Sequence, residues 1–541
     1  MKYKFTTLLF LAGIVYTNAF AQPTIKAQKT IGGNTEDMFT SMYLTKDGGL
    51  IAGGYSGSNK SGEKTENSRG GSDYWVVKLD RLGKIQWDKT IGGNSSDELS
   101  SLQQTSDGGY ILGGGSSSDI SGEKTENSRG DEEYDYWAVK LDSFGNIQWD
   151  KTIGGNNLDE ITSLQQTSDG GYILGGYSSS DKSGEKTQNS SGTYDYWVVK
   201  LNSLGNIQWD KTIGGSGYDF LTSLQQTGDG GYILGGYSSS DKSGEKTHNS
   251  RGTYDYWVVK LNSLGNIQWD KTIGGSGYDF LAALQETSDG GYILGGSSYS
   301  NKSGEKTENN RGKQLARDYW VVKLNEHGKI HWDKTIGGND HDGLLSLQQT
   351  SDGGYILSGF SYSNKSGEKT ENSRGGADYW VVKLDSLENI QWDKTIGGSD
   401  YESLYSIDEI EKNRFVLGGY SYSGVSGDKT QRSRGATDFW LVKLKYETQC
   451  PKDISSSETA NSIARLGSNK NFMVYPNPAK NILHIQTNGK AIVSLIDHAG
   501  KILLTKTIDG NGIINIADLA PGLYYLKNTT TGATEKIIIT K

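Results

Sequence analysis

The sequence has a single cysteine, Cys450, and only five prolines among 541 residues. One cysteine cannot form an intrachain disulfide, so packing has to stabilise the fold. The prolines lie at positions 23, 451, 476, 478 and 521, so no proline-rich linker interrupts residues 24–450. Apart from a short apolar stretch near the N-terminus, no hydrophobic run is long enough to cross a bilayer as a helix. These absences exclude a disulfide scaffold and a bundle of membrane helices.

Residues 1–21 have the pattern of a secretory signal peptide. Lys2 and Lys4 form a charged start, residues 8–15 an apolar core, and Ala19-Phe20-Ala21 a small-x-small cleavage signal, so we expect the mature chain to begin at Gln22. Loss of the two lysines changes the formal charge from −9 to −11. Because Lys and Arg supply affinity for nucleic acids, this balance argues against a nucleic-acid partner.

Glycine is abundant, at 75 residues, and an internal repeat accounts for it. The motif Lys-Thr-Ile-Gly-Gly begins seven times at intervals of 60 to 63 residues, at Lys29, Lys89, Lys151, Lys211, Lys271, Lys334 and Lys394. Each unit contains four short runs rich in Tyr, Trp, Val and Ile, bounded by Gly, Asn or Asp. Asp-Gly-Gly turns supply the positive φ that tight hairpins need. Four strands in a repeat of this length are typical of a blade of a β-propeller.

The two ends of the array favour a closed ring over an open solenoid. The unit that begins at Lys394 has only three runs, and its third runs directly into residues 445–446. Residues 24–31 match the missing fourth run. We therefore predict an all-β fold, with a seven-bladed propeller over residues 22–446 whose last blade is completed by the N-terminal strand. Closure leaves no unpaired edge and needs no capping repeat.

All thirteen tryptophans fall in the repeats, seven in the third runs and six in the fourth. They could form platforms for sugars. However, large rings fill the wedge between blades and the neighbouring residues are Val and Leu, so we interpret them as core.

Successive strands alternate in direction, so two sets of connections share one face of the ring. One of them carries Ser-Gly-Glu/Asp-Lys-Thr in every unit, followed by Arg in six units and by Ser191 in the third. Repeated charged loops suit multivalent binding of a repetitive ligand such as a glycan. The candidate ligand-binding residues of these loops are Glu63, Lys64, Glu123, Lys124, Glu185, Lys186, Glu245, Lys246, Glu305, Lys306, Glu368, Lys369, Asp428 and Lys429.

The other connection carries one acid per unit. Such oxygen ligands could hold Ca²⁺, although Asp in a glycine-rich loop also commonly caps backbone N–H groups. These candidate metal ligands are Asp37, Asp97, Asp159, Asp219, Asp279, Asp342 and Glu402. We predict no other cofactor.

The sequence offers no catalytic constellation. The six histidines do not recur between units, and His327 and His341 belong to opposite faces. A lone cysteine in a linker does not make a nucleophile–base pair. We therefore predict no catalytic residues.

Residues 447–471 are polar and serine-rich and are predicted to form a linker. Residues 472–541 then show short alternating runs that fit a small Ig-like β-sandwich. Their motifs, Tyr-Pro-Asn-Pro from residue 475, Pro-Gly-Leu-Tyr-Tyr-Leu from 521 and a terminal Glu-Lys-Ile-Ile-Ile-Thr-Lys, closely resemble the type A sorting domain of the type IX (Por) secretion system of Bacteroidota. The residues that carry the resemblance are Tyr475, Pro476, Asn477, Pro478, Pro521, Gly522 and Lys541.

The resemblance implies export across both membranes, contact with the type IX machinery, and release or attachment to surface lipopolysaccharide. Combined with the repeat, it leads us to expect a monomeric, secreted or cell-surface binding or adhesion propeller. Its ligand would be a polysaccharide or a surface protein. Two alternatives stay open, a hydrolase or quinoprotein-like enzyme and a structural spacer without a ligand.

Overall fold

The computed structural model describes residues 22–130, 133–313, 315–447, 472–475, 479–497, 501–530 and 534–540. The expected signal peptide and nearly all of the expected linker, with Cys450, lie outside the described residues. The chain divides into two compact units, Met1–Cys450 and Pro451–Lys541.

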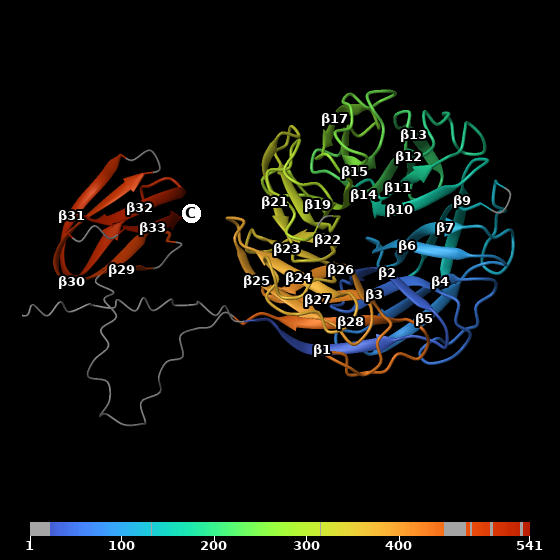
Figure 1. The fold of residues 1–541 in the computed structure, drawn as a ribbon, viewed down its shortest axis with the longest axis horizontal. Coiled ribbons are helices and arrows are strands. Elements are labelled where there is room, and N and C mark those ends of the chain that lie inside the picture. Colours follow the sequence, from blue (N-terminus) through green and yellow to red (C-terminus); the bar gives the residue numbers. More distant parts are fainter. Residues whose placement is uncertain are drawn as a thin grey trace, which may run out of the picture. The chain divides into compact units, whose positions relative to one another are not determined.

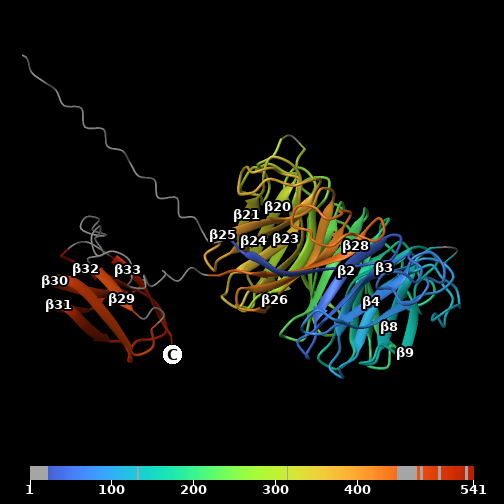
Figure 2. The ribbon, with the colours of Figure 1, turned by 90° about the horizontal axis from the view of Figure 1, so that it is seen from below.

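The first unit is a ring of seven four-stranded antiparallel sheets around a central axis (Figures 1 and 2). The strands nearest the axis are β2 (Asp37–Leu44), β6 (Asp97–Gln104), β10 (Asp159–Gln166), β14 (Asp219–Gln226), β18 (Asp279–Glu286), β22 (Asp342–Gln349) and β26 (Glu402–Glu411). The second strands are β3 (Leu50–Ser56), β7 (Tyr110–Ser116), β11 (Tyr172–Ser178), β15 (Tyr232–Ser238), β19 (Tyr292–Ser298), β23 (Tyr355–Ser361) and β27 (Arg414–Ser421). The third strands are β4 (Asp73–Leu79), β8 (Asp135–Leu141), β12 (Asp195–Leu201), β16 (Asp255–Leu261), β20 (Asp318–Leu324), β24 (Asp378–Leu384) and β28 (Asp438–Lys445). The outer strands are β5 (Ile85–Ile91), β9 (Ile147–Ile153), β13 (Ile207–Ile213), β17 (Ile267–Ile273), β21 (Ile330–Ile336), β25 (Ile390–Ile396) and β1 (Thr24–Ile31).

We number the blades along the chain, from blade 1 (β2–β5) to blade 7 (β26–β28 with β1). In blade 7 the N-terminal strand pairs antiparallel with β28, from Thr24 opposite Lys445 to Ile31 opposite Phe439. The prediction of a seven-bladed propeller closed by its N-terminal strand is confirmed.

The core lies between the blades. The seven third-strand tryptophans are fully buried, as the sequence predicted for them: Trp75, Trp137, Trp197, Trp257, Trp320, Trp380 and Trp440. At six of the seven interfaces a tyrosine of the preceding blade packs on this ring and donates its hydroxyl hydrogen to the tryptophan carbonyl. For example, the ring centroids of Tyr74 and Trp137 lie 4.9 Å apart, and the Tyr74 hydroxyl oxygen lies 3.0 Å from the Trp137 carbonyl oxygen. The blades are therefore joined by rings that also carry a directional hydrogen bond.

The second unit is a five-stranded antiparallel sheet with its own core. It comprises β29 (Phe472–Tyr475), β30 (Ile482–Asp497), β31 (Ile502–Asn515), β32 (Gly522–Asn528) and β33 (Thr534–Ile539). The strand order is β29-β30-β32-β33, and β31 pairs with β30. Leu483, Val493, Leu526 and Ile537 are fully buried in its core. This region fits the predicted Ig-like fold.

Candidate functional site

The strand directions give the propeller two different faces. The connections between blades and those between second and third strands emerge on one face, the loop face. The short hairpins emerge on the other, the hairpin face. All candidate ligand and metal residues of the propeller belong to the loop face.

The loop lysines are buried, which the sequence did not predict. Lys64 is 2% exposed, and its ammonium nitrogen donates to Ser56 Oγ and Ser68 Oγ, each at 3.0 Å. The same nitrogen lies 5.9 Å from the Trp75 ring centroid. Burial lowers the pKa of Lys64 to about 8. The equivalent lysines are equally enclosed: Lys124, Lys186, Lys246, Lys306, Lys369 and Lys429. The prediction that the lysines present their charge to a ligand therefore has to be corrected, because their side chains are buried within the loop face.

The loop acids join neighbouring blades. Glu63 accepts a hydrogen bond from Gly32 N at 3.2 Å and pairs with Arg434 of blade 7 at 2.5 Å. Five more pairs repeat this contact: Arg69–Glu123, Arg129–Glu185, Arg251–Glu305, Arg311–Glu368 and Arg374–Asp428. Blade 3 has Ser191 in place of Arg, so Glu245 lacks this partner. The lysine and the acid of the repeated loop motif thus both have a structural explanation.

The candidate metal ligands cap their own loops. Asp37 is fully buried; its carboxylate accepts from Gly33 N at 2.6 Å and from Ser56 Oγ at 2.5 Å. Burial raises its pKa to about 6. Asp97, Asp159, Asp219, Asp279, Asp342 and Glu402 are also fully buried. Within the described part of the chain, no group of three or more His, Cys, Asp or Glu side chains could hold a metal ion. These enclosed, hydrogen-bonded acids beside lysines do not fit a calcium site.

A second buried carboxyl begins each third strand and faces the capping acid of the next blade. Asp73 accepts from Arg69 N at 2.6 Å, and burial together with nearby Asp97 raises its pKa to about 6. The same causes raise the pKa of Asp135 and that of Asp195 to about 7. Because like charges repel, the two carboxyl groups of such a pair are not both readily ionised. The ring therefore contains a circle of carboxyl pairs that bind protons more tightly than free aspartate.

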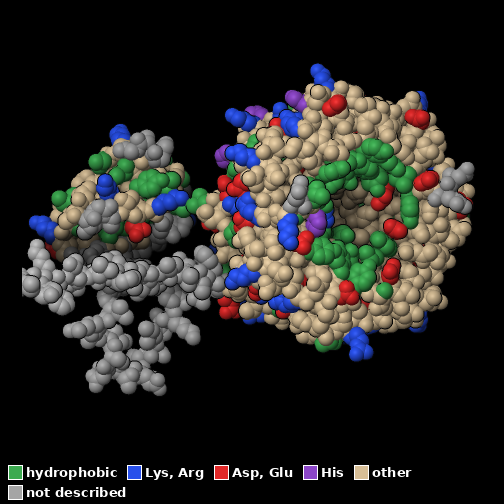
Figure 3. Space-filling model, in the orientation of Figure 1, with side chains coloured by type: hydrophobic (Ala, Val, Ile, Leu, Met, Phe, Trp, Pro, Cys, Tyr) green, Lys and Arg blue, Asp and Glu red, His purple; other side chains and the backbone are tan. Residues whose placement is uncertain are grey.

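Aromatic side chains of blades 3 to 7 line the opening of the channel on the loop face. In Figure 3 the hydrophobic class, which includes tyrosine, forms a band around this opening. We call the set the aromatic collar. Its members are Tyr177, Tyr194, Tyr218, Phe220, Tyr237, Tyr254, Tyr278, Phe280, Tyr299, Phe360, Tyr362, Tyr401, Tyr405, Tyr420 and Tyr422.

The collar rings contact one another across blades. Tyr177 of blade 3 lies 4.9 Å from Phe220 of blade 4, and Tyr237 of blade 4 lies 5.0 Å from Phe280 of blade 5. Some rings are open to solvent: Tyr218 is 41% exposed and Tyr278 44%. The collar thus consists of two groups of contacting rings, from Tyr177 to Tyr299 and from Phe360 to Tyr422, with Arg317 between them.

One side of the opening carries acids and the other a cation. Tyr134 donates to Glu98 at 3.1 Å, and Tyr177 donates to Glu160. Burial raises the pKa of Glu160 above its ordinary value. On the opposite side, the Arg317 guanidinium lies 5.1 Å from the Phe360 ring centroid. The opening is therefore amphipathic and not seven-fold symmetric.

The collar was missed at the level of sequence because it uses the positions at which the repeats differ. The second residue of the inner strands, for example, is Met38, Glu98, Glu160, Phe220, Phe280, Gly343 and Ser403. The residue before the inner strands is Glu36, Ser96, Leu158, Tyr218, Tyr278, His341 and Tyr401. A search for positions that vary while the surrounding repeat stays constant would have found them.

The sorting residues lie in the second unit. Pro521 precedes β32, and Gly522 begins it and pairs with Ile539 of β33. Tyr475 ends β29, where it pairs with His484. Pro476, Asn477, Pro478 and Lys541 lie outside the described residues.

The structure thus defines a seven-bladed β-propeller whose loop face opens onto an aromatic collar. Residues 473–540 match the family described as "Secretion system C-terminal sorting domain". This domain marks proteins exported by type IX secretion to the cell surface or the medium, and it implies contact with that secretion machinery. No described residue belongs to a helix that is long and apolar enough to cross a membrane.

Among curated proteins, the chain is similar to the regulatory protein FlaEY of Caulobacter vibrioides, with 28% identity over 143 residues. That match covers 26% of this chain, and the chain spans only about 15% of the length of this relative. Among solved structures, the chain is similar to the Neurospora crassa Pan2 WD40 domain, with 10% identity and a TM-score of 0.42 over 79% of this chain and 99% of the other. It is also similar to a puromycin hydrolase, with 9% identity and a TM-score of 0.34 over 71% of this chain and 58% of the other.

Proposed function

We propose that this protein is a secreted or cell-surface, non-enzymatic binding propeller that binds a glycan at the aromatic collar. The observation that carries the proposal is the set of exposed ring faces around the channel opening, beside carboxylates. Sugar rings present C–H faces that pack on aromatic rings and hydroxyl groups that donate to carboxylates. A chain of sugars could contact several blades at once, which raises the overall affinity without new contact types.

The test is a binding titration of the mature chain against a panel of immobilised polysaccharides. We expect the double variant Tyr218→Ala/Tyr278→Ala to weaken binding by about tenfold, since each lost stacking contact is worth roughly 0.5–1.5 kcal/mol. Phe144→Ala is the matched control, because Phe144 is 74% exposed in a hairpin on the opposite face. This control should bind as the unmodified chain does.

Two results would contradict the proposal. If the collar variant and Phe144→Ala bind equally, the collar is not the site. If the panel is not bound at all, the spacer alternative gains support. Release of shorter sugars during the titration would instead favour the hydrolase alternative.

A further inference from the structure

The interface between blade 7 and blade 1, which we call the closing seam, lacks the ring pair found at the other six interfaces. Elsewhere an outer-strand tryptophan packs on an aromatic ring of the next blade, as Trp87 packs on Tyr110 at 5.7 Å between centroids. At the seam the corresponding positions hold Ala27 and Leu50. The register confirms the equivalence, because Ala27 pairs with Lys443 as Trp87 pairs with Lys78.

The surroundings of one glycine show that the space of the absent tryptophan is not filled. A methyl group placed on Gly145 would lie 3.2 Å from Trp87, and one on Gly205 would lie 3.2 Å from Trp149. The equivalent glycine at the seam is Gly83, and it has no atom within 4 Å of such a group. The space that a tryptophan fills elsewhere is therefore open at the seam.

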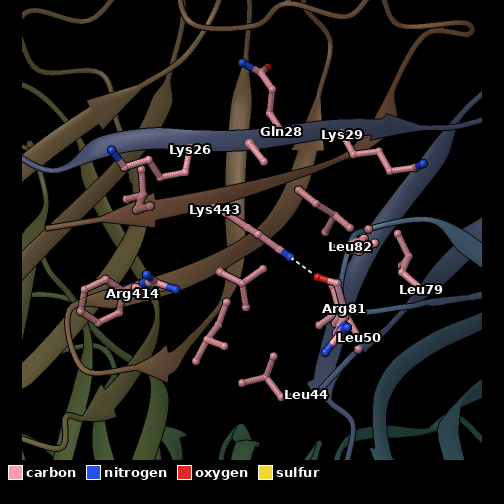
Figure 4. Close-up of a pocket in the computed structure, with 18 of the residues that line it drawn as sticks. Lys26, Gln28, Lys29, Leu44, Leu50, Leu79, Arg81, Leu82, Arg414 and Lys443 are labelled. Atoms are coloured by element: carbon pink, nitrogen blue, oxygen red, sulfur yellow. Dashed lines mark hydrogen bonds between the residues drawn. The ribbon is translucent and has the colours of Figure 1, made fainter. Parts of the chain in front are cut away.

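At the seam, the third-strand lysine of blade 7 also lacks the aspartate partner that it has in the other blades. In the other six blades the third-strand lysine is buried and pairs with an aspartate of its first hairpin, as Lys78 pairs with Asp47 at 2.9 Å. Blade 7 has no aspartate in that hairpin. Lys443 instead crosses the seam and donates to the Arg81 carbonyl oxygen at 3.1 Å (Figure 4).

Together these replacements produce a cleft of about 890 Å³ on the hairpin side of the seam. Leu44, Leu50, Phe415 and Leu441 supply apolar walls. The cationic lining residues are Lys26, Lys29, Arg81, Arg414, Lys443 and Lys445, against two acids, Asp80 and Glu411. Figure 4 shows several of these cations around the space between β1 and the blade 1 hairpins.

Three of the cations have no carboxylate partner among the described residues. Lys26 and Lys445 pair with Glu447, and Arg414 pairs with Glu411. Lys29, Arg81 and Lys443 form no such pair within the residues that the structure describes. The cleft therefore offers uncompensated positive charge around an apolar interior, and its volume lies within the range of about 300–1,000 Å³ of small-molecule sites.

We propose that the closing seam is a binding site for an organic anion with a compact apolar body, such as an aromatic carboxylate or sulfonate. The apolar body occupies the place of the absent tryptophan, beside Ala27 and Leu50. The acid group meets Arg81 and Lys443. This site is distinct from the aromatic collar, which lies on the loop face, and it lies at the interface where the repeat is interrupted.

The test uses 1-anilinonaphthalene-8-sulfonate as the probe and its uncharged analogue N-phenyl-1-naphthylamine as the comparison. Both are titrated by fluorescence against the full mature chain. We expect one saturable site that prefers the sulfonate, with affinity that falls as salt rises. Ala27→Trp restores the residue of the other blades and should abolish this site. Arg81→Gln/Lys443→Gln should weaken sulfonate binding by about tenfold and leave the uncharged probe unaffected.

Trp209→Ala is the matched control. It opens the same position between blades 3 and 4, where Lys200 keeps its partner Asp169 at 2.9 Å. That new cavity should take the uncharged probe without a preference for the sulfonate. The proposal is overturned if Ala27→Trp binds the sulfonate with unchanged affinity and stoichiometry, or if the charge variant binds as the unmodified chain does.

Discussion

At the scale of residues, each blade of the propeller buries the same group of three ionisable side chains. Each blade places a capping acid, a loop lysine and a third-strand aspartate together, all fully or nearly fully buried. Their pKa values are shifted toward the neutral forms, because a buried charge loses its hydration. This arrangement gives the lysine of the loop motif a structural role in all seven units.

These buried groups make the stability of the folded propeller depend on pH. Burial raises the pKa of the third-strand aspartates in the folded chain, to about 6 for Asp73 and about 7 for Asp195, from an ordinary value of 3.8. The folded state therefore binds more protons than the unfolded state between pH 4 and pH 7, and stability falls as pH rises through this window. We expect the melting temperature of the propeller to be higher at pH 5 than at pH 7.5.

Differential scanning calorimetry across this range measures the effect. The variant Asp195→Asn removes one of the titrating groups and should flatten the dependence in part. The hairpin aspartates act in the opposite direction only at lower pH, because the bonds that Asp47 accepts from Thr45 and Lys78 lower its pKa to about 2. A melting temperature that rises from pH 5 to pH 7.5 would contradict this account.

The sequence was informative about most residues and failed for those whose surroundings are built from distant segments. Trp137 was correctly expected in the core, since its neighbours in the strand are apolar. Lys124 stands in a polar loop and resembles a solvent-exposed residue. It is nevertheless 2% exposed, with its ammonium nitrogen 5.6 Å from the Trp137 ring centroid, and no local pattern reveals this contact.

At the scale of elements, β1 is the strand on which closure depends. It supplies the outer strand of blade 7, and Thr30 and Ile31 are buried in the seam. Without it β28 would present an unpaired edge. The repeat and its incomplete last unit were enough to predict this arrangement, because a missing strand and an extra strand at opposite ends have a single consistent solution.

Deletion of Pro23–Ile31 should therefore destabilise the whole ring. We expect a loss of at least about 3 kcal/mol, since buried side chains and a full ladder of backbone hydrogen bonds are removed. Denaturant titration of the full mature chain measures it, and trimming Gln22 alone is the control. A deletion that costs no more than this trimming would show that β1 is dispensable.

At the scale of the whole molecule, the two units have separate cores. The propeller core lies between blades, and the second unit packs its own residues around Leu483 and Leu526. This division follows the change of sequence pattern after residue 446. The aromatic collar, by contrast, is a property of the assembled ring, since its members come from several positions of different blades and no single repeat contains it.

Because each unit has its own core, we expect the two units to unfold in separate transitions. Calorimetry of the mature chain should resolve two transitions, and a chain that ends at residue 447 should keep the propeller transition with its midpoint within a few degrees. A large shift of that midpoint, or a single transition for the mature chain, would mean that the units unfold together.

The pairing of β1 with β28 also fixes an order in time. Thr24 and Lys445 are hydrogen-bonded neighbours although 421 positions separate them along the chain. Bringing such distant segments together is a slow step, because the intervening loop must first be ordered. We therefore expect β1, the first strand of the propeller to be synthesised, to dock last. Because blade 7 combines β1 with β26–β28, the ring can close only when both ends of the repeat array are in the same compartment.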